Sequence, residues 1–195
     1  MATNSELKPS LATGANLNAE TWADFVQRLK YHCQGEGVND HCTAAPIFIV
    51  ENRRLVSGID KEYVDTDRLV VYCDDSKWFS PEDYYYDLDE GMQTELDGEC
   101  CDEHGASFLN LKPYQQWEHL SCLENHTVTG YDWKWEYVNA HFTKEAAEAF
   151  IRRKAHDYGE LRVMVDSQYW AWEFNAIRNA ILDGKLVYGE AHHEE

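Results

Sequence analysis

The sequence has no long apolar run and few basic residues. No apolar stretch approaches the roughly 20 residues that a membrane-spanning helix requires, which argues against a protein that crosses a bilayer. Residues 1–17 lack a basic start followed by a hydrophobic stretch, so we expect no signal peptide and a location in the cytoplasm. Only 17 Lys and Arg face 36 Asp and Glu, a balance that argues against direct binding of nucleic acid or of an anionic membrane.

Common catalytic motifs are also missing. The chain has no glycine-rich phosphate loop, no G-x-S-x-G nucleophile motif and no H-E-x-x-H zinc motif. Its six cysteines come without an export signal, so we expect free thiols rather than disulfides. We therefore interpret the chain as a binding protein rather than an enzyme, and we assign no catalytic residue.

Apolar and aromatic residues are plentiful. They make up 44% and 13% of the 195 residues, enough to build a core and to exclude wholesale disorder. We see no internal repeat, low-complexity tract or linker. We expect a flexible N-terminus over residues 1–17, a single domain over 18–189 and an acidic tail over 190–195.

Local patterns predict several helices. Asn18 is a favourable N-cap for a helix whose apolar residues run from Trp22 to Cys33. The sequence Ser80-Pro81-Glu82-Asp83 is typical of a helix start, because Ser caps, Pro suits the first position and acids favour the first turn. We expect this helix to continue toward Leu96, and another helix to span residues 113–123.

The remaining pattern predicts an α+β fold, with a mostly antiparallel sheet and helices packed mainly on one face. Expected strands lie at residues 46–50, 55–59, 68–73, 127–142 and 161–165. A helix after Thr143 and a last helix ended by Gly184 complete a C-terminal β-α-β-α unit. In that last helix, Trp170, Phe174, Ile177 and Ile181 share one face, which we expect in the core.

The negative charge is concentrated in residues 60–103. This segment has sixteen acids and three bases, so it supplies −13 of the formal net charge of −19. It also contains many aromatic residues, whereas disordered acidic tails have few. We therefore expect carboxylates that are held on a folded surface.

Such a surface suits the basic cleft of a protein that binds nucleic acid. Duplex DNA presents one negative charge per roughly 1.7 Å of its axis, and closely spaced carboxylates imitate that pattern. The predicted function is to inhibit or modulate a nucleic-acid-binding machine by occupying its cleft, with tyrosines as anchors. The partner-binding candidates are Asp65, Asp67, Asp74, Asp75, Glu82, Asp83, Tyr84, Tyr85, Tyr86, Asp87, Asp89, Glu90, Glu95, Asp97 and Glu99.

Three other interpretations stay open. The acidic face has a simpler explanation as a solvated surface that confers solubility. Asp65-Thr66-Asp67 and Asp74-Asp75 also suit Mg²⁺ in a small metal-dependent nuclease or phosphoesterase. The aromatic residues also suit an oligomer interface in an assembly protein.

Two adjacent pairs, His32-Cys33 and His41-Cys42, are candidate zinc ligands. The usual spacing of two to four residues between ligands is absent, however. The alternative is that Cys33 packs on the apolar face of the first helix while His32 lies at the surface. Cys100-Cys101 with His104 is a second candidate group. We assign no cofactor, with zinc as the one alternative.

Several stretches carry a resemblance to known proteins. They are YVNAHFTKEAAEAFIRRK at residues 137–154, WEFN at 172–175, and DHCTA at 40–44 with the strand that follows it and GID at 58–60. These stretches resemble a group of small uncharacterised proteins from tailed bacteriophages and prophages. The resemblance carries no catalytic signature. It implies a phage accessory protein that acts in the bacterial cytoplasm on a host protein or complex.

Overall fold

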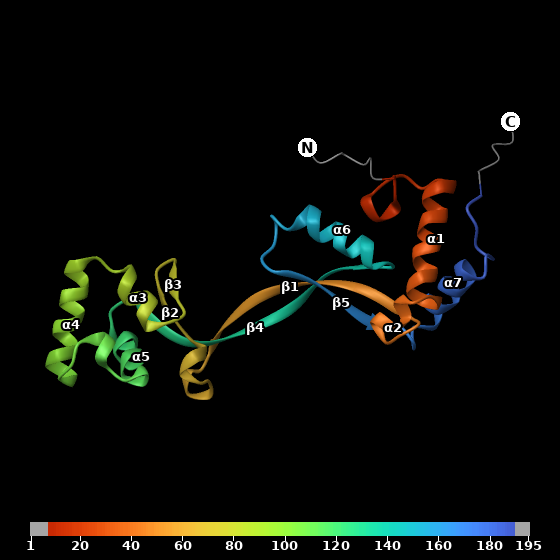
Figure 1. Cartoon of the computed structure of the whole chain (residues 1–195). Coiled ribbons are helices and arrows are strands. Elements are labelled where there is room, and N and C mark those ends of the chain that lie inside the picture. The colour runs from red at the N-terminus through yellow and green to blue at the C-terminus, as the bar shows by residue number, and fades with distance from the viewer. Residues whose placement is uncertain (1–7, 190–195) are drawn as a thin grey trace. The chain divides into compact units, whose positions relative to one another are not determined.

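The chain forms an α+β fold, which confirms the predicted class. The computed structural model describes residues 8–189, and within them five strands form one antiparallel sheet in the order β3-β2-β4-β1-β5 (Figure 1). The strands are β1 (Pro46–Ile59), β2 (Leu69–Cys73), β3 (Ser76–Trp78), β4 (His126–His141) and β5 (Leu161–Ser167). The N-terminal residues 1–7 and the predicted acidic tail 190–195 lie outside the described residues.

The chain divides into two compact units. Unit 1 comprises Met1–Arg53 and Trp135–Glu195, and unit 2 comprises Arg54–Lys134. The chain passes from one unit to the other within the neighbouring strands β1 and β4, so no linker separates the units in sequence. That residues 18–189 fold as one cooperative domain stays a prediction.

Unit 1 contains the predicted C-terminal β-α-β-α unit. Its helices are α1 (Ala19–Gln34), α2 (Gly37–His41), α6 (Lys144–Lys154) and α7 (Trp172–Leu182). The order β4-α6-β5-α7 is as predicted, but β1 is inserted between β4 and β5 in the sheet. Because β1 is antiparallel to both neighbours, β4 and β5 run parallel and α6 is their crossover helix.

The core of unit 1 has two parts. Phe48 and Val50 are two residues apart on β1, so their buried side chains face the same side, where they pack with Ala147 of α6. Leu29 of α1 packs against Ile181 and Leu182 of α7. The predicted N-cap of α1 is confirmed, since Asn18 Oδ1 accepts a hydrogen bond from the Thr21 amide.

The predicted buried face of the last helix is wrong in part. Ile181 is buried, but Ile177 is exposed and Trp170 is 79% exposed. Trp170 precedes the helix, which begins at Trp172, and Arg178 is buried one position after Ile177. The buried residues of the helix are Arg178, Ile181 and Leu182, of which the predicted face includes only Ile181.

Residues 8–17, which we expected to be a flexible lead-in, include the 3-10 helix η1 (Leu11–Thr13). Ser10 caps this turn and its hydroxyl donates to Asp24 Oδ2 of α1 over 2.6 Å. Ser10 is also buried, so this segment packs against the rest of unit 1.

Unit 2 combines the short strands β2 and β3 with three helices. These are α3 (Pro81–Asp87), α4 (Glu90–His104) and α5 (Pro113–Cys122), with the 3-10 helices η2 (Lys61–Tyr63), η3 (Thr66–Arg68) and η4 (Phe108–Asn110). Ser80 caps α3 as predicted, because its hydroxyl accepts from the Asp83 amide at 3.0 Å. The buried centre of this unit includes Leu69 and Val71 of β2, Phe108 of η4 and Trp117 of α5.

The helix predicted from Pro81 toward Leu96 is interrupted. The helix α3 ends at Asp87, and α4 begins after Asp89, whose side chain accepts a hydrogen bond from the Met92 amide at 2.9 Å. Asp89 therefore starts a second helix, which contains Gly91.

Candidate functional site

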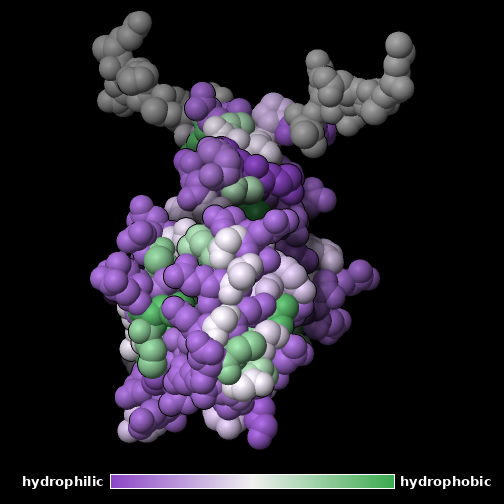
Figure 2. All heavy atoms as spheres, turned by 90° about the vertical axis from the view of Figure 1, so that its left-hand side faces the viewer, coloured by the Kyte–Doolittle hydropathy of each residue, from purple (hydrophilic) through white to green (hydrophobic). Residues whose placement is uncertain are grey.

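Unit 2 carries most of the negative charge of the protein. It has 19 Asp and Glu against six Lys and Arg, so its formal net charge is −13, whereas unit 1 carries the remaining −6. Seventeen of the 19 carboxylates are exposed; Asp97 and Asp132 are partly buried. Figure 2, which views the molecule from the side on which α4 and α5 lie, shows a surface that is hydrophilic over most of its area.

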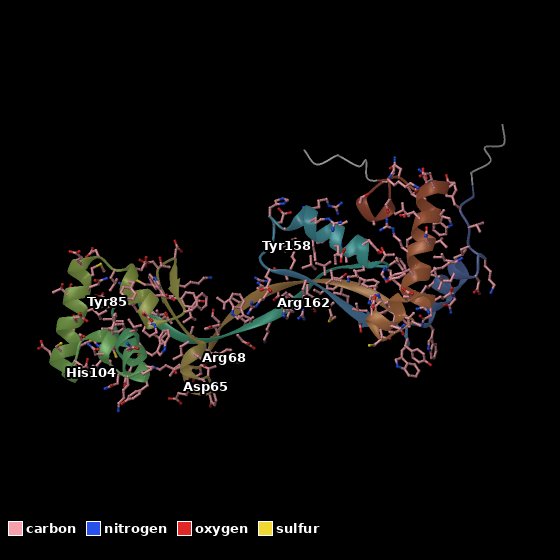
Figure 3. The ribbon with its side chains drawn as sticks, viewed as in Figure 1. Asp65, Arg68, Tyr85, His104, Tyr158 and Arg162 are labelled. Atoms are coloured by element: carbon pink, nitrogen blue, oxygen red, sulfur yellow. The ribbon has the colours of Figure 1, made fainter. Side chains whose placement is uncertain are left out.

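The twelve predicted acids lie in three places in unit 2. Asp65 and Asp67 flank the start of η3, and Asp74 and Asp75 form the turn between β2 and β3. The other eight belong to α3, α4 and the junction between them: Glu82, Asp83, Asp87, Asp89, Glu90, Glu95, Asp97 and Glu99. Figure 3 shows Asp65 in its own segment, apart from α4, the helix that carries His104. The acids therefore do not form one continuous row.

In the part of the chain that the structure describes, the twelve predicted acids have no Lys or Arg partner. Across residues 8–189, none of the twelve carboxylates forms an ion pair with a Lys or Arg side chain. Their hydrogen bonds come from neutral donors, for example the indole N–H of Trp78, which donates to Asp87 Oδ2 at 3.0 Å. Within residues 8–189, the negative charge of these acids is therefore not offset by direct ion pairs with Lys or Arg.

The helix α4 carries the densest part of this surface. It has no Lys or Arg, and Glu90, Glu95, Glu99, Asp102 and Glu103 are all exposed. From Glu90 to Glu103 the axis rises by about 20 Å, so the five exposed carboxylates follow one another on average about every 5 Å along it. This spacing is comparable with the roughly 3.4 Å between charges along one strand of duplex DNA.

Asp97 is the one predicted acid that is partly buried, and it accepts hydrogen bonds from groups inside unit 2. Its Oδ1 accepts from the Phe108 amide at 2.9 Å and its Oδ2 accepts from the Tyr85 hydroxyl at 3.0 Å. The Tyr85 ring stacks on Phe108, with centroids 5.9 Å apart. The hydrogen bond to Asp97 raises the pKa of Tyr85 above its ordinary value of 10.0. Asp97 thus holds η4 against α3 and α4, which sequence spacing does not show.

The three predicted tyrosine anchors differ in their surroundings. Tyr84 is buried and its hydroxyl hydrogen-bonds His126 Nε2 at 3.0 Å, so its assignment to the binding surface is wrong. Tyr85 is partly buried and bonded to Asp97. Tyr86 is 65% exposed and is the only one of the three that is available as an anchor. Three consecutive positions of a helix point in different directions, so they do not share one face.

The acids proposed for Mg²⁺ are not gathered. Within the part of the chain that the structure describes, Asp65, Asp67, Asp74 and Asp75 take part in no three-residue group with metal-ligand spacing. Asp67 instead lines a hollow of about 530 Å³ together with Glu82 and Trp117.

The first zinc candidates are brought together only in part. His32 Nδ1 lies 2.9 Å from His41 Nε2, and His32 Nε2 lies 3.0 Å from Glu145 Oε2 of α6. Cys33 instead packs on the apolar side of α1, as the alternative predicted, and exposed Cys42 lies near the Asn39 carbonyl. His32 is buried rather than at the surface. The group is therefore a Glu145–His32–His41 chain of hydrogen bonds. The sequence pattern did not indicate Glu145, because it is 113 residues from His32.

In the second candidate group, His104 belongs to a cluster of metal-ligand type within residues 8–189, but Cys100 and Cys101 do not. Cys100 is fully buried, and burial raises the pKa of its thiol to about 11. A protonated thiol is a poor metal ligand. His104, by contrast, lies close to His119 of α5, a residue that the sequence pattern did not single out.

No protein family, curated protein or solved structure matches the chain. Among residues 8–189, no helix is long and apolar enough to cross a membrane.

Proposed function

We propose that the protein is an acidic binding protein, and that unit 2 occupies a basic, nucleic-acid-binding surface on a partner protein. The observation that carries this proposal is the exposed and internally unbalanced charge of unit 2. Seventeen exposed carboxylates occur in 81 residues, and none of the predicted twelve has a Lys or Arg partner in residues 8–189.

A solvated surface that serves only solubility does not need such an arrangement. Ordinary soluble surfaces intersperse both signs of charge, whereas α4 presents five exposed acids and no Lys or Arg. A field of one sign attracts a complementary surface and raises the rate of encounter. Tyr86, which is exposed at the end of α3, adds an aromatic side chain of the kind that binding surfaces favour.

The partner is then a protein whose cleft is lined by Lys and Arg. Its binding to the chain weakens as salt screens the charges, with a Debye length of about 8 Å at physiological ionic strength. Duplex DNA competes for the same cleft, because both ligands offer closely spaced negative charge. A phage protein that acts on host machinery in the bacterial cytoplasm is the setting that the sequence resemblance suggests.

The experiment uses capture of proteins from nuclease-treated bacterial lysate on the immobilised chain, followed by binding assays with each purified partner. We expect binding that weakens as salt rises from about 0.05 to 0.5 M, and that duplex DNA displaces. The test variant is Glu90→Gln/Glu95→Gln/Asp102→Asn on α4. The matched control, Glu20→Gln/Glu36→Gln/Glu173→Gln, removes three exposed charges from unit 1.

The α4 variant should lose binding and the unit 1 variant should keep it. A partner whose affinity is insensitive to salt, or that binds duplex DNA and the chain at the same time, contradicts the proposal. So does an equal loss in both variants, because this indicates an effect of total charge rather than of unit 2.

Exposed aromatics in unit 1 favour a second candidate function, self-assembly. Tyr169, Trp170 and Trp172 lie close together in sequence and are all strongly exposed. Aromatic residues of this kind are enriched in protein interfaces. Light scattering over a range of protein concentrations tests this function, with Trp170→Ala/Trp172→Ala as the variant that should dissociate an oligomer.

A further inference from the structure

A cluster of metal-binding residue types lies at the C-terminal end of α4. Glu103 and His104 belong to the last turn of α4, and His119 belongs to α5. One potential ligand atom of each residue lies within 4.8 Å of the other two. Glu103 Oε2 is 3.3 Å from His119 Nδ1 and 3.5 Å from His104 Nε2. One carboxylate oxygen thus lies close to a nitrogen of each imidazole.

The ring of His119 is buried between two carboxylates. His119 is only 7% exposed, and its Nε2 has no hydrogen-bond partner within residues 8–189. This nitrogen lies 3.7 Å from Glu99 Oε2, while Nδ1 faces Glu103. A neutral imidazole has one N–H and one lone pair, so either tautomer directs a lone pair at a carboxylate. A cation beside the ring interacts favourably with both carboxylates.

A metal ion among Glu103, His104 and His119 accounts for both imidazoles beside one carboxylate. Zinc bonds of about 2.0–2.2 Å at a tetrahedral angle place neighbouring ligand atoms roughly 3.3 Å apart. The separations of 3.3 and 3.5 Å around Glu103 Oε2 are close to this value.

We propose that Glu103, His104 and His119 bind a divalent transition-metal ion of the zinc type, with Glu99 as a positioning residue. Two imidazoles with one carboxylate suit zinc and its neighbours, whereas Mg²⁺ prefers oxygen ligands alone. Glu99 Oε2 lies 3.7 Å from His119 Nε2, so a small movement of this exposed side chain lets it accept the Nε2 proton and leave the Nδ1 lone pair for the ion, as outer carboxylates do at many histidine sites.

The group of ligand atoms that lie within 4.8 Å of one another contains neither Cys100 nor Cys101. Cys100 is instead buried in the centre of unit 2, where burial raises the pKa of its thiol. Three protein ligands leave a fourth position for water or for a group of a bound molecule. Because the Glu103 side chain is 63% exposed, this position lies at the protein surface. The site does not depend on the proposed binding function.

The experiment is a titration of the untagged, chelator-treated chain with Zn²⁺ alone, followed by calorimetry and by elemental analysis after dialysis. We expect one equivalent of zinc per chain. Glu103→Gln and His104→Ala should each abolish stoichiometric uptake. Glu99→Ala should still bind one equivalent, with an affinity lower by about 10- to 100-fold. Co²⁺ in place of Zn²⁺ gives a visible absorption band, which Glu103→Gln should remove.

Two matched variants separate this site from its neighbours. Cys101→Ser removes an exposed thiol of α4, and Glu118→Gln removes the exposed carboxylate next to His119. Both should bind zinc as the unmodified chain does. The proposal is overturned by a lack of stoichiometric uptake, by uptake that survives both Glu103→Gln and His104→Ala, or by loss of zinc in Cys101→Ser. Since His119→Ala removes a buried ring, the test uses the two more exposed ligands.

Discussion

Replacement of Glu145 by Ala should destabilise the folded protein by about 1–3 kcal/mol. Glu145 accepts a hydrogen bond from His32 Nε2 over 3.0 Å, and His32 is buried. Without the carboxylate, the imidazole N–H loses its acceptor, and an unsatisfied buried donor costs about this amount. The ion pair itself contributes less than the hydrogen bond, because the Glu145 side chain is 37% exposed and solvent screens its charge.

Two companion variants separate the hydrogen bond from the charge. Glu145→Gln keeps an acceptor oxygen, so its cost should stay below about 1 kcal/mol, from the lost charge near the N-terminus of α6. Glu148→Ala removes a neighbouring carboxylate of the same helix that pairs only with exposed Lys144. Its effect should lie within about 0.5 kcal/mol.

The cost of Glu145→Ala should depend on pH. The hydrogen bond from His32 lowers the pKa of Glu145 below its ordinary value of 4.5. A carboxyl group whose pKa is lowered by folding stabilises the protein above its unfolded pKa, and this stabilisation is lost as the pH falls below that value. The difference between the two proteins should thus be constant from about pH 7 to 5 and shrink below about pH 4.5.

Urea unfolding followed by tryptophan fluorescence, at several pH values, measures these differences. The reasoning is refuted if Glu145→Ala and Glu148→Ala have equal effects at neutral pH. It is also refuted if the difference grows, rather than shrinks, as the carboxyl group becomes protonated.

Four other substitutions have expected effects on the stability of the folded protein. Phe108→Ala removes a fully buried ring and should cost about 3–5 kcal/mol in urea unfolding. Burial, followed by the nearby charge of His32, lowers the pKa of His41 below 6.5. The free energy of unfolding should therefore fall as the pH drops below that value, and this fall should be smaller in His41→Gln. Ser80→Ala removes the α3 cap and should cost about 1 kcal/mol, measured by thermal unfolding. Trp170→Ala should change stability by less than about 0.5 kcal/mol, since the ring is exposed.

Local signals in the sequence located most elements. Ser80 and Pro81 marked the start of α3, and alternating apolar residues marked β5, because capping and side-chain periodicity depend only on neighbouring residues. The strand β1 was predicted as two pieces, residues 46–50 and 55–59. It is continuous because pairing of backbone groups in a sheet does not require an apolar side chain at every position.

Contacts between distant segments were not predictable in the same way. The concentration of acids in unit 2 is a property of composition, whereas the inward orientation of Asp97 depends on the amide of Phe108 in a later loop. The i, i+4 spacing of Glu99 and Glu103 was a usable signal for one helix face. His119 had no such signal, because only the packing of α5 against α4 brings it to those carboxylates.

The two crossings of the chain, in β1 and in β4, have a consequence for how unit 2 unfolds. The 81 residues of Arg54–Lys134 start and finish in strands that are neighbours in the sheet. If this stretch melts while the sheet of unit 1 persists, it becomes a closed loop rather than a free tail. Closing a flexible loop of that length costs on the order of 4 kcal/mol of chain entropy. Because its two ends stay held in the sheet, the melted segment gains less chain entropy than a free tail would. This favours the folded form of the segment that carries most of the charge.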